Sequence, residues 1–348
     1  MTKKVSMQQI ADRLGLSKYS VSQALSGKQG VSEETREKVI EMAKAMGYSF
    51  SPASAPADNR QSAEAGQPAG ERSFVLIWTK PDQRRDISFW NRVISGIIDG
   101  CELYGRDHLI ISNNTGEQEF EFPPYADRSS CVGVILLGSL TDSTLLAVKK
   151  LGLPVVLADH YAPFLGIDCV VNANLEAAKT VCLNVIASKA GSIVFVGDDG
   201  FSVSFSERRW GCQIAVMEEN EKNGSNVAFA RWTVPYRGPW RHALETEIKH
   251  MTEDNRPDCF ICANDDIAVG LLTLLRNYEY SVPGQFKVVG FDDIEMAAHS
   301  NPPLTTVDFG KEDLGFRTIE VLERRIAKPD SAPEKVVLSF RLVVRQSG

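Results

Sequence analysis

The chain has 348 residues, which is enough for two or three domains, and its 43% apolar and 24% charged residues are typical of a soluble globular protein. No stretch approaches the roughly 20 apolar residues of a membrane helix, and the first six residues lack a signal-peptide run, so we expect a cytoplasmic protein with no membrane contact. Residues 1–50 hold eight Lys/Arg and five Asp/Glu, so they carry +3 and the remainder carries −10 of the net −7. This asymmetry suits a protein that touches phosphate with one end only.

The cysteines are seven in number and scattered through the body. Cys259 and Cys262 match C-x-x-C, but they lie in an apolar run that predicts a buried strand, on which their sulfurs would point to opposite faces. No second Cys pair or nearby His completes a metal site. We therefore predict core cysteines in a reducing compartment, with no metal and no cofactor.

Residues 5–47 predict three short helices. Ser6 and Gln9 fit a capping box at the start of the first helix. Gly15 ends that helix, and Ser17 caps the next one across a tight turn. A third helix begins at Ser32. The short turn between the first two helices favours a helix-turn-helix domain, with the plain alternative of a three-helix interaction module.

The second helix has the features of a base reader. Val21, Ala24 and Leu25 recur at helical spacing and should face the other helices. The outward positions are then Lys18, Tyr19, Ser22 and Gln23. Glutamine pairs with adenine through N6 and N7, lysine donates to guanine acceptors, and tyrosine offers a hydroxyl and a ring face.

This head resembles the DNA-binding domain of the lactose-repressor (LacI/GalR) family. The matching motifs are Gln9-Ile10-Ala11, Leu16-Ser17, Val21-Ser22-Gln23-Ala24-Leu25-Ser26-Gly27, Val31-Ser32-Glu33-Glu34-Thr35-Arg36 and Met46-Gly47-Tyr48. The resemblance implies base contacts by Lys18, Tyr19 and Gln23 and backbone contacts by Ser17 and Ser22, and we add Ser6 to this DNA-binding set. Many family members carry Arg where Gln23 stands, so the base preference there differs.

Residues 51–72 predict a flexible linker between a head (residues 1–50) and a body (residues 73–348). This segment holds no Leu, Ile, Val, Met or aromatic residue, and Pro52 and Pro56 oppose a continuous helix. The resemblance implies a hinge helix here, with a Leu wedge that kinks the operator. Because no wedge is present, we expect weaker DNA bending and a smaller ligand effect on DNA affinity than in typical members.

From residue 74 to residue 290, strands and helices alternate. The expected strands cover 74–78, 108–111, 132–137, 154–158, 192–196, 226–234, 259–262 and 286–290, and the expected helices cover 89–104, 145–151, 175–187, 207–219, 240–251 and 267–278. This alternation predicts parallel sheets with helices on both faces. About 275 residues exceed one comfortable core, so we expect two α/β lobes.

Charged residues follow three of these strands, where ligands bind in open α/β sheets. They are Asp159, Asp265 and Arg208, which can accept from or donate to sugar hydroxyls. Asp265 could instead be a helix cap, and Arg209 competes with Arg208 for its role.

The body also resembles the effector-binding core of the same family, which is of periplasmic-binding-protein type. The markers are Gly133-Val134-Ile135-Leu136, Leu153-Pro154-Val155-Val156, Ala263-Asn264-Asp265-Asp266-Ile267-Ala268-Val269-Gly270, Gly290-Phe291-Asp292-Asp293 and Pro302-Pro303-Leu304-Thr305-Thr306-Val307. The resemblance implies effector contacts by Arg208, Asp265 and Asp159, by Phe89 and Trp90 on the first lobe, and by Trp240 as a stacking ring. Trp90 and Trp240 could equally be core residues.

The predicted protein is a homodimeric transcriptional repressor without catalytic residues. Two heads meet a pseudo-palindromic double-stranded operator, and a small ligand, a sugar or sugar derivative, changes the angle between the lobes. One alternative is a cytoplasmic sugar sensor with weak or non-allosteric DNA binding. An enzyme is disfavoured because no phosphate-binding glycine loop and no nucleophile elbow are present, and the head and missing signal peptide disfavour a transporter's solute-binding protein.

Overall fold

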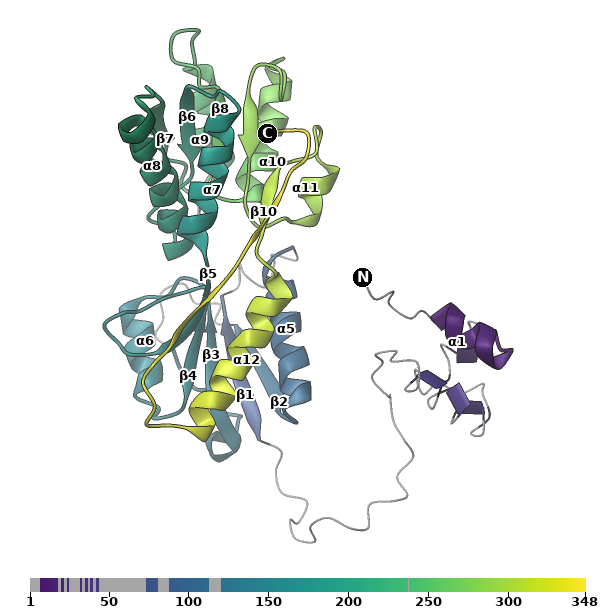
Figure 1. Ribbon diagram of the computed structural model, residues 1–348. Coiled ribbons are helices and arrows are strands. Elements are labelled where there is room, and N and C mark those ends of the chain that lie inside the picture. The colour runs from purple at the N-terminus through teal and green to yellow at the C-terminus, as the bar shows by residue number, and fades with distance from the viewer. Residues whose placement is uncertain are drawn as a thin grey trace. The chain divides into compact units, whose positions relative to one another are not determined.

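Figure 1 shows the computed structural model of the chain. The structure describes residues 7–17, 20–21, 24, 32, 35–36, 38–39, 42–43, 73–80, 88–112, 120–236 and 238–348. The chain divides into two compact units, Met1–Gly70 and Glu71–Gly348. Within the described residues, no helix is long and apolar enough to cross a membrane.

The first unit contains a small helical core. Helix α1 (Met7–Leu14) ends at Gly15, whose φ of 66° lies in the left-handed region that glycine tolerates. The buried residues are Ile10, Ala11, Val21, Ala24, Val39 and Ala43. The predicted inward positions Val21 and Ala24 are confirmed, at 0% and 2% exposure, whereas Leu25 lies outside the described residues. The Ser17 hydroxyl accepts from the Ser20 amide at 3.0 Å, as expected of a helix cap.

The second unit holds two lobes, each built on a parallel sheet. Lobe 1 has the strand order β11-β5-β4-β3-β1-β2. Its strands are β1 (Phe74–Thr79), β2 (Asp107–Ser112), β3 (Cys131–Leu137), β4 (Val155–Ala158), β5 (Asp168–Asn172) and β11 (Lys335–Leu338), and its helices are α5 (Trp90–Leu103), α6 (Asp142–Lys149), α12 (Lys311–Ala327) and the 3₁₀ turn η1 (Arg128–Ser130). Successive residues of β1 enter two different apolar clusters, so both faces of the sheet are covered.

Helices α5 and α12 lie in close backbone contact on one face of this sheet. A Cβ added to Gly96 would lie 2.0 Å from the Glu312 carbonyl oxygen, and one added to Gly315 would lie 1.9 Å from the Val93 carbonyl oxygen. Only glycine fits at these positions. The Arg92–Glu312 ion pair, with Nη2 2.8 Å from Oε2, joins the same two helices.

Lobe 2 has the strand order β7-β6-β8-β9, again all parallel. Its strands are β6 (Ser192–Val196), β7 (Ala228–Trp232), β8 (Cys259–Cys262) and β9 (Lys287–Val289), and its helices are α7 (Asn174–Ala187), α8 (Val203–Asn223), α9 (Trp240–Lys249), α10 (Asp265–Asn277) and α11 (Glu295–His299). Helix α7 packs on α8, and α9 packs on α10. The two predicted lobes with parallel sheets are confirmed.

Three segments of the described chain cross between the lobes: residues 172–174, 308–311 and 338–341. Strands β10 (Thr306–Asp308) and β12 (Arg341–Val343) pair antiparallel beside the second and third crossings. The Ala173 amide donates to the Leu338 carbonyl at 2.9 Å, which ties the first crossing to the third. In Figure 1 the yellow C-terminal segment runs from the lower lobe to the upper one.

The sequence prediction stopped too early. It closed the series at residue 290, but α11, β10, α12, β11 and β12 follow, and β5 was also missed. The apolar residues of α12 recur at helical spacing, as in Leu314, Ile319 and Leu322, so a signal was present. The missed strands are short, three to five residues, and each gains stability from pairing with a distant segment.

The seven cysteines are all buried and unpaired. Cys259 and Cys262 both lie in β8, and burial raises the pKa of each thiol far above its ordinary value. In the described part of the chain, no group of three or more His, Cys, Asp or Glu side chains is placed to hold a metal ion.

Candidate functional site

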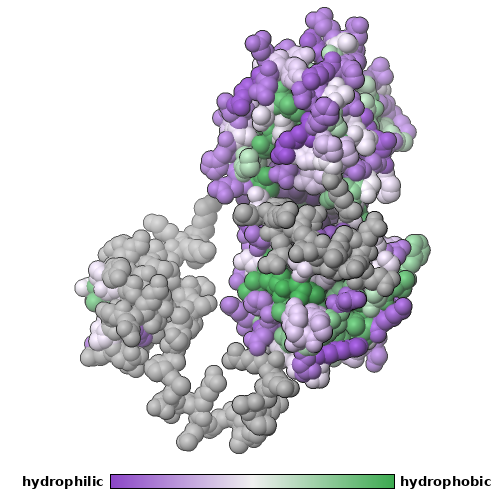
Figure 2. Space-filling view, turned by 180° about the vertical axis from the view of Figure 1, so that it is seen from behind, coloured by the Kyte–Doolittle hydropathy of each residue, from purple (hydrophilic) through white to green (hydrophobic). Residues whose placement is uncertain are grey.

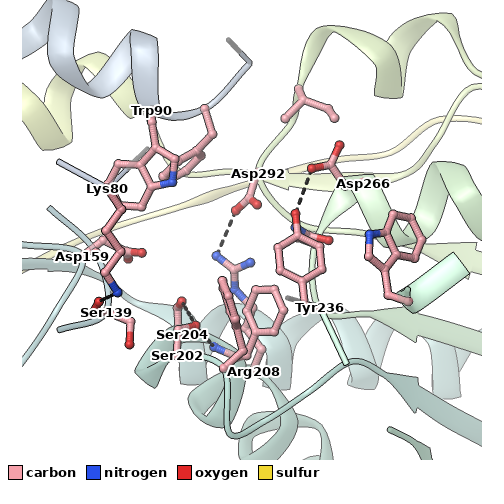
Figure 3. Close-up of a pocket in the computed structure, with 17 residues that line it drawn as sticks. Lys80, Trp90, Ser139, Asp159, Ser202, Ser204, Arg208, Tyr236, Asp266 and Asp292 are labelled. Atoms are coloured by element: carbon pink, nitrogen blue, oxygen red, sulfur yellow. Dashed lines mark hydrogen bonds and ion pairs between the residues drawn. The ribbon is translucent and has the colours of Figure 1, made fainter. Parts of the chain in front are cut away.

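A pocket of about 640 Å³ lies between the two lobes, at the carboxyl ends of their strands (Figure 3). Lobe 1 contributes Lys80, Phe89, Trp90, Gly138, Ser139 and Asp159. Lobe 2 contributes Phe201, Ser202, Ser204, Phe205, Arg208, Tyr236, Trp240, Asn264, Asp266, Asp292 and Ile294. Its size and its mixture of aromatic and polar walls are those of a small-molecule site.

Arg208 is the central cation of the pocket, and it is almost completely buried. It lies in the second turn of α8, which begins where the Ser202 hydroxyl accepts from the Phe205 amide at 3.2 Å. Its Nη2 donates to Asp292 Oδ1 at 2.9 Å, its Nη1 to the Ala263 carbonyl at 2.7 Å and its Nε to Asn174 Oδ1 at 2.9 Å. These three bonds offset the cost of burying the charge and fix the guanidinium in one orientation.

Two aromatic rings lie beside the same guanidinium. The Arg208 Cζ atom lies 5.0 Å from the ring centre of Phe291 and 5.0 Å from that of Phe309. These rings are nearly parallel, 12° apart, with centres separated by 6.4 Å. Attraction between the cation and the two rings adds to the three hydrogen bonds that hold the guanidinium.

Asp159 faces the pocket from the end of β4, with a backbone φ of 54° in the left-handed region. Burial raises the pKa of its carboxyl to about 7, although the charge of Arg208 lowers it in part and the charges of Asp292 and Glu207 raise it further. Among the described residues, no group hydrogen-bonds to this carboxyl. Asp159 is thus a carboxyl that changes charge near neutral pH.

A second polar cluster lies at the start of α10. The Tyr236 hydroxyl donates to Asp266 Oδ2 at 2.9 Å and accepts from Asn264 Nδ2 at 2.8 Å. Asn264 is also the N-cap of α10, because its Oδ1 accepts from the Ile267 amide at 3.0 Å. The Tyr236 ring lies within 4.9 to 6.2 Å of the rings of its aromatic neighbours Phe201, Phe205 and Trp240. This wall of the pocket is therefore held together by its own hydrogen bonds and ring contacts.

Asp265 is the one predicted effector contact that does not line the pocket. It is fully buried, and its carboxyl accepts from the Thr306 hydroxyl at 2.6 Å and from the Ile294 amide at 3.1 Å. Burial and the nearby charge of Asp292 raise the pKa of this carboxyl. Consecutive residues of a helix point about 100° apart, so Asp266 lines the pocket while Asp265 supports the wall behind it.

The other predicted contacts, Phe89, Trp90, Asp159, Arg208 and Trp240, all line the pocket. Phe89 and Trp90 meet edge to face, with ring centres 5.0 Å apart. Trp240 also serves the core: it is 8% exposed, and a Cβ on Gly270 would lie 2.7 Å from its ring. The competing position Arg209 is outside the pocket lining and pairs with Asp199 at 2.7 Å.

Sequence reasoning missed the other lining residues. Asp292 follows β9, so the rule that selected Asp159 also selects it. Lys80 follows β1 and donates to the Ser139 carbonyl, which is another position at a strand end. Tyr236 lies in a connection between β7 and α9 and carries no such signal.

The predicted DNA-contacting residues lie in the first unit. Ser17 is described, and its hydroxyl caps the second helix. Ser6, Lys18, Tyr19, Ser22 and Gln23 lie outside the described residues, as does the predicted linker at residues 51–72.

Comparison with known proteins identifies both units. Residues 6–51 match bacterial regulatory proteins of the lacI family, and residues 187–348 match the periplasmic binding protein-like domain. The HTH-type transcriptional repressor PurR of Mannheimia succiniciproducens is 23% identical over 343 residues, 97% of each chain. Catabolite control protein A of Priestia megaterium is 24% identical and covers 99% of each chain.

Solved structures share the fold. The transcriptional regulator CelR in complex with cellobiose has a TM-score of 0.66 at 21% identity and covers 99% of this chain and 100% of that one. A LacI family regulator of Enterococcus faecium with bound ribose has a TM-score of 0.65 at 19% identity, covering 79% and 98%. The lac repressor dimer bound to operator has a TM-score of 0.64 at 19% identity, covering 99% of each chain. With a matching head, a matching core and relatives that align along the whole length, the chain belongs to the LacI family and is a DNA-binding transcriptional regulator.

Proposed function

We propose that the pocket between the lobes binds an uncharged, polyhydroxylated effector, a sugar, and that its occupancy changes the affinity of the protein for its operator. The observation that carries the proposal is the Arg208–Asp292 pair, a fixed donor and acceptor held 2.9 Å apart at the centre of a pocket with aromatic walls. A fixed donor–acceptor pair recognises vicinal hydroxyls, and flat rings suit the apolar faces of a sugar. No catalytic step is part of this function.

The charges of the pocket favour a neutral ligand over an anionic one. Three carboxyl groups, those of Asp159, Asp266 and Asp292, line it. Among the described residues, the lining cations are Arg208, which makes three hydrogen bonds, and Lys80, which donates to the Ser139 carbonyl. Within this described lining, a phosphate or carboxylate ligand would meet more carboxyl groups than cations. Sugar phosphates should therefore bind less tightly than the parent sugars.

The relatives support the sugar class. Two solved structures with this fold hold cellobiose and ribose. A planar base is another ligand class that suits a pocket with aromatic walls. The surplus of carboxyl groups over cations among the described lining residues and the polar clusters on lobe 2 favour a polyol, and the ligand panel tests the planar base.

On the DNA side, we propose a cytoplasmic homodimer that presents two heads to a pseudo-palindromic operator. Lys18, Tyr19 and Gln23 read bases, Ser17 and Ser22 contact the backbone, and Ser6 completes the DNA-binding set. Residues 1–50 form the head, residues 51–72 the linker and residues 73–348 the effector-binding body. The missing apolar wedge in the linker supports weaker DNA bending than in typical family members.

The test is calorimetric titration of the full-length protein with matched pairs of ligands. We would use ribose and ribose 5-phosphate, glucose and glucose 6-phosphate, cellobiose, and the purine bases hypoxanthine and guanine. We expect at least one neutral sugar to bind, and its phosphate to bind at least about tenfold more weakly, a difference of roughly 1.4 kcal/mol. The reason is that carboxyl groups outnumber cations among the described lining residues. Preferential binding of a phosphate or a purine would contradict the proposed ligand class.

A further inference from the structure

The turn formed by Asp292 and Asp293, between β9 and α11, has an unusual backbone. The φ angles are 105° at Asp292 and 45° at Asp293, so two consecutive residues other than glycine lie in the left-handed region. That region is sparsely populated by residues with a Cβ, and such a conformation persists only where neighbours hold it. The neighbours of this turn include side chains linked to the first two crossings and a residue on the chain that continues from the third.

The first crossing reaches the turn through the pocket. Arg208 Nη2 donates to Asp292 Oδ1 at 2.9 Å, and Arg208 Nε donates to Asn174 Oδ1 at 2.9 Å. Asn174 is part of the crossing at residues 172–174, and its Nδ2 donates to the Asn172 carbonyl at 3.2 Å. The arginine of the pocket therefore bonds on one side to the turn and on the other to the crossing.

The second crossing reaches the turn through Lys311, the first residue of α12. This side chain is 1% exposed, and its Nζ donates to the carbonyl oxygens of Asp292 and, at 3.3 Å, of Asp293. Its Nζ also lies 3.7 Å from Asp308 Oδ1. A buried lysine is costly unless its charge is balanced, so its place here indicates a specific role. The next residue, Glu312, pairs with Arg92 of α5, whose first residue Trp90 lines the opposite wall of the pocket.

The chain that continues from the third crossing through β12 reaches the turn at Arg345, two residues beyond that strand. Its Nη2 donates to Asp293 Oδ1 at 2.7 Å, and its Nη1 donates to the Leu304 carbonyl at 2.8 Å. Its side chain is 20% exposed. The first two crossings are thus one or two side chains away from the two aspartates, and the chain that continues from the third bonds to Asp293 through Arg345.

We propose that the Asp292–Asp293 turn is the junction through which the pocket acts on all three connections between the lobes, with Lys311 and Arg345 as the positioning residues that hold it. The Asp292 carboxyl lies in the pocket, while its carbonyl and the neighbouring Asp293 face the crossings. A ligand that competes for Arg208 or Asp292 therefore changes the contacts of the turn directly. Its effect reaches the crossings without being transmitted through either sheet. This regulatory meaning rests on the proposed function.

The experiment is hydrogen exchange, followed by mass spectrometry, on the full-length protein without ligand. Lys311→Met and Arg345→Met each remove a cation from the turn, and Lys328→Met removes an exposed cation from the other end of α12 as the matched control. We expect exchange at residues 290–294 to become about tenfold faster in both test variants, because each loses hydrogen bonds from a charged donor. Peptides that cover residues 172–176 and 203–210 should also exchange faster, while β3, β6 and β8 and the control variant remain unchanged.

A conservative variant of Arg345 distinguishes a positioning role at the turn from a general contribution to the stability of the protein. Arg345→Lys keeps the cation beside Asp293, so it should restore most of the protection that Arg345→Met loses. Faster exchange throughout both lobes, or a change confined to the first turn of α12, would overturn the junction. Arg345→Met decides the question even where Lys311→Met does not fold, because the Arg345 side chain is partly exposed. The sugar panel is a separate measurement, so its failure would remove the proposed ligand but not the junction.

Discussion

Lobe 2 brings to the pocket side chains that are already bonded to one another, whereas lobe 1 brings fewer groups and less mutual support. On lobe 2, Arg208 has three fixed partners, and Tyr236 joins Asn264 to Asp266. On lobe 1, the Asp159 carboxyl has no hydrogen-bonding partner among the described residues. Figure 3 shows this contrast, with most dashed lines on the lobe 2 side of the pocket.

The contrast suggests a division of labour between the two walls. A wall whose donors and acceptors are held in place loses little freedom on binding and contributes specificity. A wall whose carboxyl has no hydrogen bond from the described residues gains most from a ligand that bridges to it. Lobe 2 would then recognise the effector, and lobe 1 would respond by moving toward it.

Figure 2 shows the opposite side of the molecule, where hydrophobic residues gather on the lower lobe.

The largest expected effect follows from removing the central cation. Arg208→Ala leaves the buried Asp292 carboxyl, Asn174 and the Ala263 carbonyl without their donor. We expect a loss of about 3–5 kcal/mol in the free energy of unfolding and at least about 100-fold in affinity for the tightest-binding sugar of the panel. Chemical unfolding and calorimetry measure the two effects. Arg209→Ala is the matched control, and unchanged sugar binding by Arg208→Ala would refute the assigned site.

The next prediction concerns Asp159 on lobe 1 and the pH dependence of protein stability. Folding raises the pKa of Asp159 from its ordinary value of 3.8 to about 7. Between these two pH values, the folded protein holds a proton on Asp159 that the unfolded chain has released. The contribution of Asp159 to stability is therefore greatest at low pH, falls as the pH rises toward 7 and is constant above it. Asp159→Asn removes this dependence, and its stability relative to wild type should rise by about 2 kcal/mol between pH 5 and pH 8.

Denaturant unfolding of wild type and Asp159→Asn at several pH values measures this difference. Parallel profiles would show that Asp159 does not titrate in this range. That result would contradict the proposed difference between lobe 1, with a carboxyl that titrates near neutral pH, and lobe 2, whose polar groups are held by hydrogen bonds.

The smallest effect tests how far the wall of lobe 2 is preassembled. Tyr236→Phe removes one hydroxyl that bonds to Asp266 at 2.9 Å and to Asn264 at 2.8 Å, and it leaves the aromatic packing intact. We expect sugar affinity to fall by about tenfold, because a hydrogen bond to a charged group is worth roughly 1.5–3 kcal/mol. Tyr278→Phe, which removes a hydroxyl bonded to Glu245 at 2.9 Å away from the pocket, is the control. Equal affinities of the two variants would contradict a preassembled wall.

Much of this organisation was predictable from local patterns. The apolar positions Val21 and Ala24 indicated the core of the head, and Ser17 indicated a helix cap. The alternation of strands and helices indicated two lobes with parallel sheets, and the strand-end rule selected Arg208 and Asp159. These features depend on neighbours within about one or two turns or one strand, so a linear pattern carries them.

Other features depend on segments far apart in the chain. Periodicity could not say which of Asp265 and Asp266 faces the ligand, because the choice depends on where Thr306 and the Ile294 amide lie. Tyr236 joined the site only because its loop packs against the start of α10.

Local patterns were sufficient to predict the helical head, the two α/β lobes and the strand ends that line the pocket, since hydrophobic spacing and helix caps act over short distances. Contacts between distant segments set which carboxyl bonds to Arg208, which lining carboxyl has no hydrogen bond from the described residues, and how the Asp292–Asp293 turn meets the crossings. The hydrogen bonds concerned join residues 19 to 84 positions apart, and such distances leave no trace in local spacing.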